Sequence, residues 1–476
     1  MDTTISLAAG IFVPMTTGAA IMVLLFYREP LPMPLHLAFS YALGLGTLTI
    51  WMLLLGMAGV KFSLGAIGLP LLGFSCAVFI ARLYRWKREP VGSGIFLSKH
   101  LLNNLSLFSV INATFYIILL LYIAHNLLFV FWRAMNVPIS EWDAIATVAF
   151  KAKIFFYERS LPDLNLLPHR TYPLFVPFAQ TWVALNLGYW SDQFVKIIFP
   201  CALLSYLIVF YHFLARWTNR RWGLLGCAIL LSANFFIYHA TLSYSDFFLM
   251  YFNSIAVILL LDWGRCHGRG TLVLAGIFAG LATFTKLEGT SFLLIYFILF
   301  ATINFSRGAF GPKEKISNLF QFSLPSVGLC VLYHLYKFLH NATEDGTGII
   351  NKTGIDFSMA KMRLLPETIE NFTNNLFFSG NWNIVWFLAL LSCVHLANKW
   401  KDSLVRYVLA SLILFFGLYA AVALGTVNYV WIAGKFHATT LSRIILHFYP
   451  LSVVLIILLN FPSDLSGIKT QVPGNR

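Results

Sequence analysis

The chain has 476 residues, of which 59% are hydrophobic and only 11% charged, and its mean hydropathy is +0.76. Soluble domains carry about 25% charged residues, so this composition excludes a soluble protein and indicates one that crosses a membrane many times. The net charge of +14 comes from basic residues placed between apolar segments, which favours cytoplasmic loops over a nucleic-acid-binding face. We therefore expect membrane lipids, and no nucleic acid, among its partners.

Apolar segments of about 17 to 25 residues recur from end to end, each long enough to cross a hydrocarbon core of about 30 Å as a helix. The first lacks a basic start and a clear cleavage site, so we interpret it as a retained helix. The six cysteines lie in or beside such segments and predict no disulfide framework. Fourteen segments are candidates, at roughly 5–26, 35–58, 62–84, 106–132, 172–190, 194–215, 223–241, 247–262, 271–286, 289–305, 318–339, 383–398, 405–424 and 443–460.

Residues 1–90 predict three helices that end in the basic run RLYRWKREP, and we interpret them as an accessory membrane segment before the main module at 91–476. Basic clusters in a polytopic protein mark loops held on the cytoplasmic side. With this run inside, the helix at 106–132 runs outward, and the polar loop after it, at about 133–171, faces the periplasm or a lumen. A second external loop is expected at 340–382.

Two full crossings at 172–190 and 194–215 would return the next basic cluster to the outside. The first segment is shorter and begins with two prolines, so we predict that it is re-entrant or interfacial. The expected fold class is an all-α polytopic membrane protein with about 13 transmembrane helices and an external catalytic first loop. This topology puts the following residues on the external face: Glu141, Asp143, Asp246, Lys286, Glu288 and Arg443.

The first external loop is dense in charge and broken by prolines, so interfacial helices such as 141–158 are expected there. Within it, Glu141 and Asp143 flank Trp142. On an extended segment their side chains would share one face, about 6.5 to 7 Å apart, whereas on a helix they would diverge by about 200°. Such carboxylates can accept a proton from an attacking hydroxyl or hold Mg²⁺ or Mn²⁺, although a solvated helix start capped by the preceding serine gives the same pattern.

Charged residues also interrupt later apolar segments, where an unpaired charge is costly. Asp246, in TLSYSDFFLMYF, is expected to have a chemical role or a cationic partner unless it lies in a plain loop. Lys286 and Glu288, in LATFTKLEGTSFLL, could pair with each other, or the lysine could bind a phosphate. Arg443, in TTLSRIILHFYPL, suits bidentate phosphate binding but also a snorkelling position at the interface.

His169 and Arg170, just before Tyr172, are further candidates for binding a phosphate. The candidates and their flanking motifs follow one another in this order: Glu141-Trp142-Asp143, Lys151-Ala152-Lys153, Tyr172-Pro173-Leu174, Gln180, Gly188, Asp246, Thr285-Lys286-Leu287-Glu288-Gly289, Arg443 and Pro450. This ordered set, over roughly residues 100–460, resembles the GT-C superfamily of integral-membrane glycosyltransferases. Within this superfamily, the chain resembles the glycosyltransferase family 39-like branch. That branch contains protein O-mannosyltransferases and the transferase that adds aminoarabinose to lipid A.

The resemblance implies a transferase with a polyprenyl-phosphate-linked sugar donor, a glycan, lipid or protein acceptor, and an active site facing the periplasm or a lumen. A bacterial inner membrane is the expected location. The resemblance implies Glu141 or Asp143 as the base or cation-holding acid and Asp246 as a second acid near the acceptor. A single-displacement reaction at such a site predicts inversion at the sugar carbon. The remaining candidates are Lys286, Arg443, His169 and Arg170 for the donor phosphate, with Glu288 and Tyr172 as further site residues.

Three features depart from the family pattern. The first-loop acids are Glu-x-Asp rather than adjacent, and we expect three extra helices before the module and no soluble C-terminal domain after it. The acceptor and the identity of the base therefore stay open. Two alternatives remain beside the transferase. A polysaccharide ligase or polymerase of the O-antigen type would depend on Arg443 and His437 rather than on carboxylates, and a lipid or glycan transporter would have paired broken helices and internal symmetry.

Overall fold

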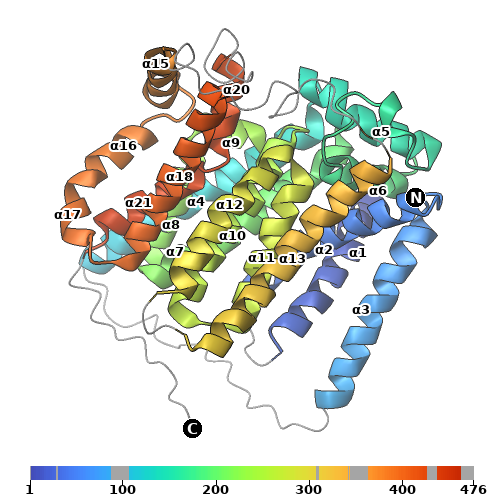
Figure 1. Ribbon diagram of the computed structural model, residues 1–476, viewed down its shortest axis with the longest axis horizontal. Helices are drawn as coiled ribbons and strands as arrows, with labels where there is room; N and C mark the ends of the chain where they lie inside the picture. The colour runs from blue at the N-terminus through green and yellow to red at the C-terminus, as the bar shows by residue number, and fades with distance from the viewer. Residues whose placement is uncertain are drawn as a thin grey trace.

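The computed structural model describes residues 2–27, 31–86, 107–306, 310–340, 342, 363–425 and 437–462, and every regular element among them is helical (Figure 1). The prediction of an all-α protein is confirmed. The helices are α1 (Thr3–Leu25), α2 (Met33–Met57), α3 (Leu64–Trp86), α4 (Leu107–Asn136), α5 (Ala149–Glu158), α6 (Phe175–Leu187), α7 (Ile198–Trp217), α8 (Arg220–Ser232), α9 (Asn234–His239), α10 (Ser245–Cys266), α11 (Arg269–Thr285), α12 (Leu287–Asn304), α13 (Pro312–Leu339), α15 (Leu365–Phe377), α16 (Val385–Ser392), α17 (Leu396–Lys399), α18 (Ser403–Gly425), α20 (His437–Leu446) and α21 (Tyr449–Asn460).

Nine of the described helices are long and apolar enough to cross a membrane: α1, α2, α3, α4, α7 with the turn before it, α10, α12, α13 and α18. A tenth would be the pair α20 and α21, which is bent by 49°. An integral membrane protein is therefore confirmed by helix length and composition, while the number of about 13 crossings stays a prediction. Besides that bent pair, four expected segments form helices of 17 residues or fewer, namely 172–190 (α6), 223–241 (α8 and α9), 271–286 (α11) and 383–398 (α16 and α17).

Helix α6 illustrates why a hydropathy pattern overestimates helix length. It begins after Pro173 and ends at Gly188, whose backbone is left-handed (φ 81°). Its 13 residues span about 20 Å, which is less than the hydrocarbon core of about 30 Å. Twelve of the 13 residues are buried, so α6 lies inside the protein.

Helices α1 and α2 cross in close contact because two glycines meet the opposite backbone. A Cβ atom on Gly18 would lie 1.8 Å from the carbonyl oxygen of Ser40, and one on Gly44 would lie 1.8 Å from that of Pro14. Small residues at such crossings let membrane helices pack closely. Larger side chains would push the two helices apart.

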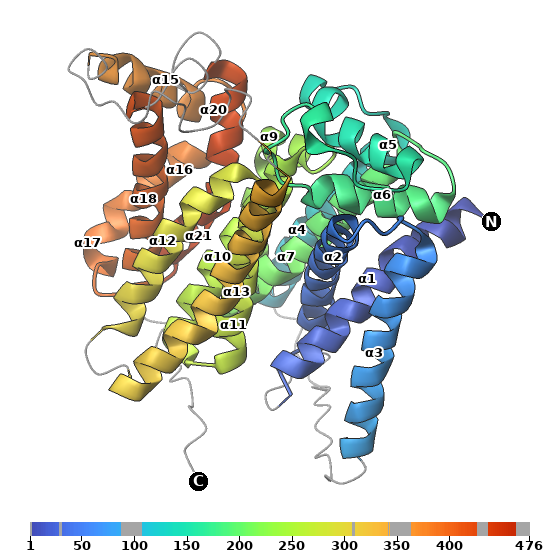
Figure 2. The same cartoon turned by 45° about the vertical axis from the view of Figure 1, so that its right-hand side comes forward.

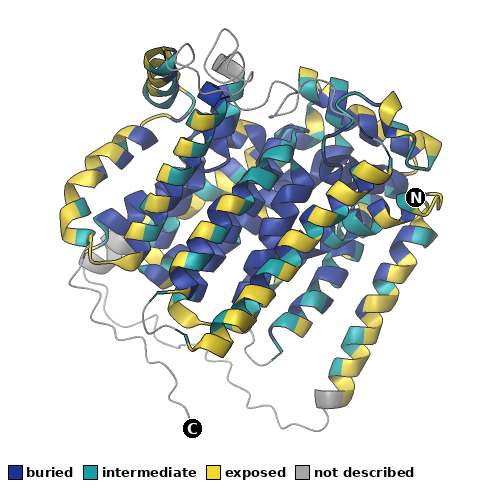
Figure 3. Ribbon diagram, viewed as in Figure 1, coloured by how far each residue is buried: buried dark blue, intermediate teal, exposed yellow. Residues whose placement is uncertain are grey.

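The α1–α2 pair is part of the main core rather than a separate bundle. Ser205 of α7 donates a hydrogen bond to the Ala38 carbonyl at 2.7 Å, and the Tyr41 hydroxyl donates to the Ile198 carbonyl at 2.7 Å. Helix α3 is different, because most of its surface is exposed (Figure 3). The predicted boundary near residue 90 lies outside the described residues.

Helix α10 lies at the centre of the bundle, and 94% of its most apolar stretch is buried (Figure 3). Helix α11 packs on α13 through Gly276 and Gly280, where a Cβ would lie 2.6 Å from the Phe322 carbonyl oxygen and 2.7 Å from that of Pro325. This spacing of four residues keeps one glycine face toward the partner helix. The tight contact holds the end of α11 in a defined position.

One end of the bundle gathers the first-loop helix α5 with α6, α9, α15 and α20, at the top of Figures 1 and 2. Because α10 and α12 begin at this end, the basic residues Arg265, Arg269 and Lys313 lie at the other end, where the sequence predicts the cytoplasmic side. About half of the second predicted loop, 341 and 343–362, lies outside the described residues.

Candidate functional site

A cavity of about 510 Å³ lies at this end of the bundle, where the first-loop region meets the starts of α10 and α12. Helices α18 and α20 complete its wall. Of the nine candidates from the sequence, only Glu141 and Arg170 are absent from the lining. The seven that line it are Asp143, His169, Tyr172, Asp246, Lys286, Glu288 and Arg443.

Asp246 lies at the start of α10, just after the extended residue Tyr244 (φ −112°, ψ 148°). It occupies the second helical position, where the partial positive charge of the helix N-terminus favours a carboxylate. Its side chain is only 4% exposed, so its charge needs compensation. Two donors provide it, because the Lys286 ammonium and the His447 imidazole lie 2.9 and 3.0 Å from Oδ1.

The junction between α11 and α12 places Lys286 and Glu288 beside Asp246. Lys286 is extended (φ −155°, ψ 153°), and Gly289 allows the sharp corner because a Cβ there would lie 2.0 Å from the Ala282 carbonyl oxygen. Lys286 Nζ lies 2.9 Å from Asp246 Oδ1 and 2.8 Å from Glu288 Oε1. Burial by itself would lower the pKa of Lys286, but the two carboxylates outweigh it and raise the pKa above its usual value. The lysine is therefore charged.

An ion pair between Arg443 of α20 and Asp143 ties the first loop to the C-terminal part of the bundle. The ring of Tyr244 lies under the guanidinium, with 5.4 Å between Cζ and the ring centroid. Partial burial, together with the Asp143 carboxylate, raises the pKa of Tyr244 to about 12, so the phenol is neutral. The Asp143 side chain is 47% exposed, which makes it far more accessible than Asp246.

Glu141 has different partners from Asp143, although only one residue separates them. Its carboxylate accepts hydrogen bonds from the Ser140 hydroxyl and from the Tyr238 hydroxyl of α9, each at 3.1 Å. The chain enters a helix here and continues as a π-helical turn, so side chains at i and i+2 diverge. Of the two first-loop acids, Asp143 lines the cavity and Glu141 attaches the loop to α9.

The residues present do not fit the Mg²⁺ or Mn²⁺ site considered from the sequence. Glu141 and Asp143 belong to separate hydrogen-bond networks, and Asp143 is already neutralised by Arg443. No group of three or more His, Cys, Asp or Glu side chains in the described part of the chain is placed to hold a metal ion. Dependence on either ion stays a prediction, which chelation of the purified protein would test.

His169 forms a fixed turn on the cavity wall. Its backbone is left-handed (φ 46°), and its ring stacks on Tyr172 with centroids 5.0 Å apart. Lys151, which is buried on α5, donates to the His169 carbonyl at 2.7 Å. A left-handed backbone is strained in a residue other than glycine, so these contacts hold the turn in place. Arg170 instead donates to Asn165 Oδ1 at 3.0 Å, outside the cavity lining.

Two residues of the site, Tyr419 and His447, were not among the candidates. His447 is fully buried at the bend between α20 and α21, and it joins Asp246 to the Tyr419 hydroxyl. A tyrosine in the apolar segment of α18 gives no sequence signal beyond packing. The histidine, four residues after Arg443, was detectable as a second polar residue in the same apolar segment. The side chain of His437, on which the ligase alternative depends, lies outside the described residues.

Comparison with known proteins gives no match to a family model, to a curated protein or to a solved structure. The chemistry of the site therefore follows from its own groups. Part of the lining is apolar, from Phe292, Leu418, Val422 and Ile444. The charged part consists of Asp143, Asp246, Glu288, Lys151, Lys286 and Arg443. A cavity with both parts suits an amphiphile, because the cations and helix N-termini attract an anionic head group while the apolar wall contacts a chain.

Proposed function

We propose that the protein is a membrane glycosyltransferase that moves a hexose or pentose from a polyprenyl-phosphate donor to a glycan, lipid or protein acceptor. The reaction would occur on the periplasmic or lumenal face of the membrane. In a bacterium, this membrane would be the inner membrane. The observation that carries the proposal is one cavity that combines Asp143 and Asp246 with Lys286 and Arg443 beside an apolar wall. A lipid-linked sugar phosphate has the complementary parts, which are an apolar chain, an anionic phosphate and a hydroxyl-rich sugar.

In the proposed reaction, Asp143 takes the proton of the acceptor hydroxyl while its oxygen attacks the anomeric carbon. The bond from that carbon to the phosphate oxygen breaks, and its electron pair stays on the departing polyprenyl phosphate. Lys286 and Arg443 stabilise the developing charge, and attack opposite the leaving group inverts the anomeric centre. Asp143 suits the role of base because it is 47% exposed, whereas Asp246 holds two donors on one oxygen.

The ion pair between Arg443 and Asp143 would couple donor binding to the chemical step. A donor phosphate competes with Asp143 for the guanidinium, since arginine binds phosphate and carboxylate through the same donors. A carboxylate oxygen that is bonded to arginine is blocked from an acceptor hydroxyl. Arrival of the donor would therefore release the Asp143 oxygen at the moment when it is needed.

The test is transfer of radiolabelled sugar from polyprenyl-phosphate donors by the purified protein in lipid nanodiscs. We expect Asp143→Asn to slow transfer by about 10²- to 10⁴-fold, the usual contribution of a general base. Glu141→Gln is the matched control from the same loop, because its amide oxygen can still accept the Tyr238 hydrogen bond, and it should keep most of the activity. Melting temperatures of all variants check folding.

Three outcomes would count against this mechanism. Full activity in both Asp143→Asn and Asp246→Asn would refute the carboxylate chemistry and favour the ligase alternative. Retention of configuration in the product would refute single displacement. Donor binding without transfer, across a panel of sugars and acceptors, would favour the transporter.

A further inference from the structure

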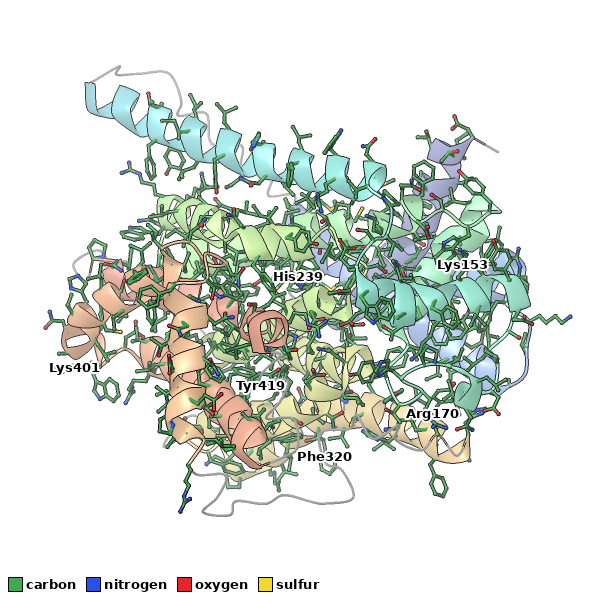
Figure 4. The ribbon with its side chains drawn as sticks, turned by 90° about the horizontal axis from the view of Figure 1, so that it is seen from above. Lys153, Arg170, His239, Phe320, Lys401 and Tyr419 are labelled. Atoms are coloured by element: carbon green, nitrogen blue, oxygen red, sulfur yellow. The ribbon has the colours of Figure 1, made fainter. Side chains whose placement is uncertain are left out.

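A buried chain of hydrogen bonds joins two groups that line the cavity. The Tyr419 hydroxyl lies 2.7 Å from His447 Nδ1, and His447 Nε2 lies 3.0 Å from Asp246 Oδ1. Tyr419 is found near the centre of the bundle when the molecule is seen from above (Figure 4). The histidine does not line the cavity itself, and Asn253 donates to its backbone carbonyl at 2.7 Å. His447 is thus held at both ring nitrogens and at its backbone carbonyl.

The partners of His447 determine where the protons of this chain lie. Asp246, ionised beside Lys286, can only accept, so the hydrogen of the imidazole is on Nε2. Nδ1 is then an acceptor, and its donor is the Tyr419 hydroxyl. A second proton on the ring would add a buried cation next to Lys286, which is unfavourable. The chain therefore runs in one direction, from the tyrosine through the histidine to the carboxylate.

This direction leaves two oxygens that can only accept hydrogen bonds from a ligand. The single proton of the Tyr419 hydroxyl is used by His447. Both donors to Asp246 contact Oδ1, and no hydrogen bond from the described residues reaches Oδ2. The phosphodiester of a lipid-linked sugar is ionised and offers only acceptors, so it does not match this pair. A group with several O–H donors does match it.

We propose that Tyr419 and Asp246 form a subsite for hydroxyl groups of the transferred sugar, separate from the cations Lys286 and Arg443 that would bind the phosphate. The inference rests on the proposed function and adds the part of the substrate that is recognised here. His447 is a positioning residue, because it acts only through the two oxygens that it orients. A sugar that lacks a hydroxyl at this subsite is bound less tightly.

The test compares the affinity of the purified protein for a polyprenyl phosphate alone and for the same lipid carrying glucose, galactose, mannose or arabinose. We expect the best sugar to bind more tightly than the bare lipid. Tyr419→Phe should reduce this advantage by about 2- to 12-fold, the range for one neutral hydrogen bond, and leave the affinity for the bare lipid unchanged. His447→Phe should reduce the same advantage, because it removes both the acceptor of the Tyr419 hydroxyl and the donor to Asp246.

A matched control is Tyr41→Phe, which removes a buried hydroxyl that donates to the Ile198 carbonyl at 2.7 Å and does not line the cavity. It should leave both affinities unchanged. Deoxy analogues of the best sugar locate the contact, because one of them should bind wild type and Tyr419→Phe equally.

The two proposals fail in different ways. Equal affinity of wild type for the bare lipid and all sugar-bearing lipids would overturn the hydroxyl subsite. An unchanged sugar advantage in Tyr419→Phe would also overturn it, even if wild type transfers sugar. Failure of every polyprenyl phosphate to bind would instead refute the proposed function.

Discussion

Replacement of Gly289 by alanine would add one methyl group at the corner where α11 ends and α12 begins. The new Cβ would lie 2.0 Å from the Ala282 carbonyl oxygen, which is about 1.4 Å closer than the 3.4 Å at which ordinary contact begins. The three nearest atoms all belong to the backbone of residues 282 and 283, so no side chain can rotate to make room. The two helices must move apart by on the order of 1 Å.

This movement would displace Lys286, which lies at the corner and contacts Asp246 at 2.9 Å and Glu288 at 2.8 Å. Overpacking of this kind costs about 1–3 kcal/mol of folding free energy. A shift of about 1 Å at a reacting centre costs about 10²-fold in rate. We therefore expect Gly289→Ala to lower the melting temperature and to slow sugar transfer by about 100-fold.

Melting of the purified protein in detergent measures the first effect, and the nanodisc transfer assay measures the second. Gly328→Ala in α13 is the matched control, because a Cβ at that position would meet nothing within 4 Å. There the loss of glycine from a helix should stabilise the protein by about 0.5–1 kcal/mol. Wild-type melting and wild-type transfer in Gly289→Ala would refute the argument that this corner sets the position of Lys286.

Two further predictions concern charge. Lys286→Met leaves the buried carboxylates without their cation and should cost about 3–5 kcal/mol. Because the pKa of Lys286 is raised, its stabilisation is complete at any pH below about 10.5, so melting at pH 6 and pH 9 should show the same deficit. A deficit that shrinks at pH 9 would contradict this. His239 is 2% exposed, and burial lowers its pKa to about 4. Its neutral form therefore contributes stability above pH 6.5 that is lost by roughly 3 kcal/mol as the pH falls toward 4. His239→Gln should remove this acid sensitivity, and a variant that still loses as much stability as wild type between pH 8 and pH 4 would contradict the prediction.

Charges in apolar surroundings were the most informative part of the sequence. Asp246, Lys286 and Arg443 are far apart in the chain, yet the alternation of basic loops predicted that they share one face of the membrane protein. They line the same cavity because a buried charge must find a partner, and the partners available in a helix bundle lie at the same depth. The apolar composition predicted the helical fold because backbone N–H and C=O groups in a membrane must be hydrogen-bonded within the protein. A helix forms these hydrogen bonds within one segment.

Helix ends and side-chain directions were harder to predict. A hydropathy window averages over a break such as Ala233, so the segment 223–241 was expected to be one full crossing although it forms the shorter helices α8 and α9. The separation of Glu141 from Asp143 depends on the residue at which one helix begins, which the i, i+2 spacing leaves open. Arg170 turned out to lie outside the cavity because a neighbouring asparagine accepts its hydrogen bond. Tyr419 had no signal, because its polar partner is contributed by a distant bend.

The contact between α2 and α7 has a consequence for how the protein is made. Helix α2 ends at residue 57 and α7 begins at residue 198, so roughly 140 residues separate the two in synthesis. At about 5–20 residues per second, the α1–α2 hairpin waits roughly 7–28 s in the membrane before its partner is translated. During this time the Tyr41 hydroxyl lacks the Ile198 carbonyl that accepts its hydrogen bond. Nascent chains truncated before α7 should therefore be cleaved by a membrane protease faster than chains that extend beyond it, and equal cleavage would show that the hairpin is stable alone.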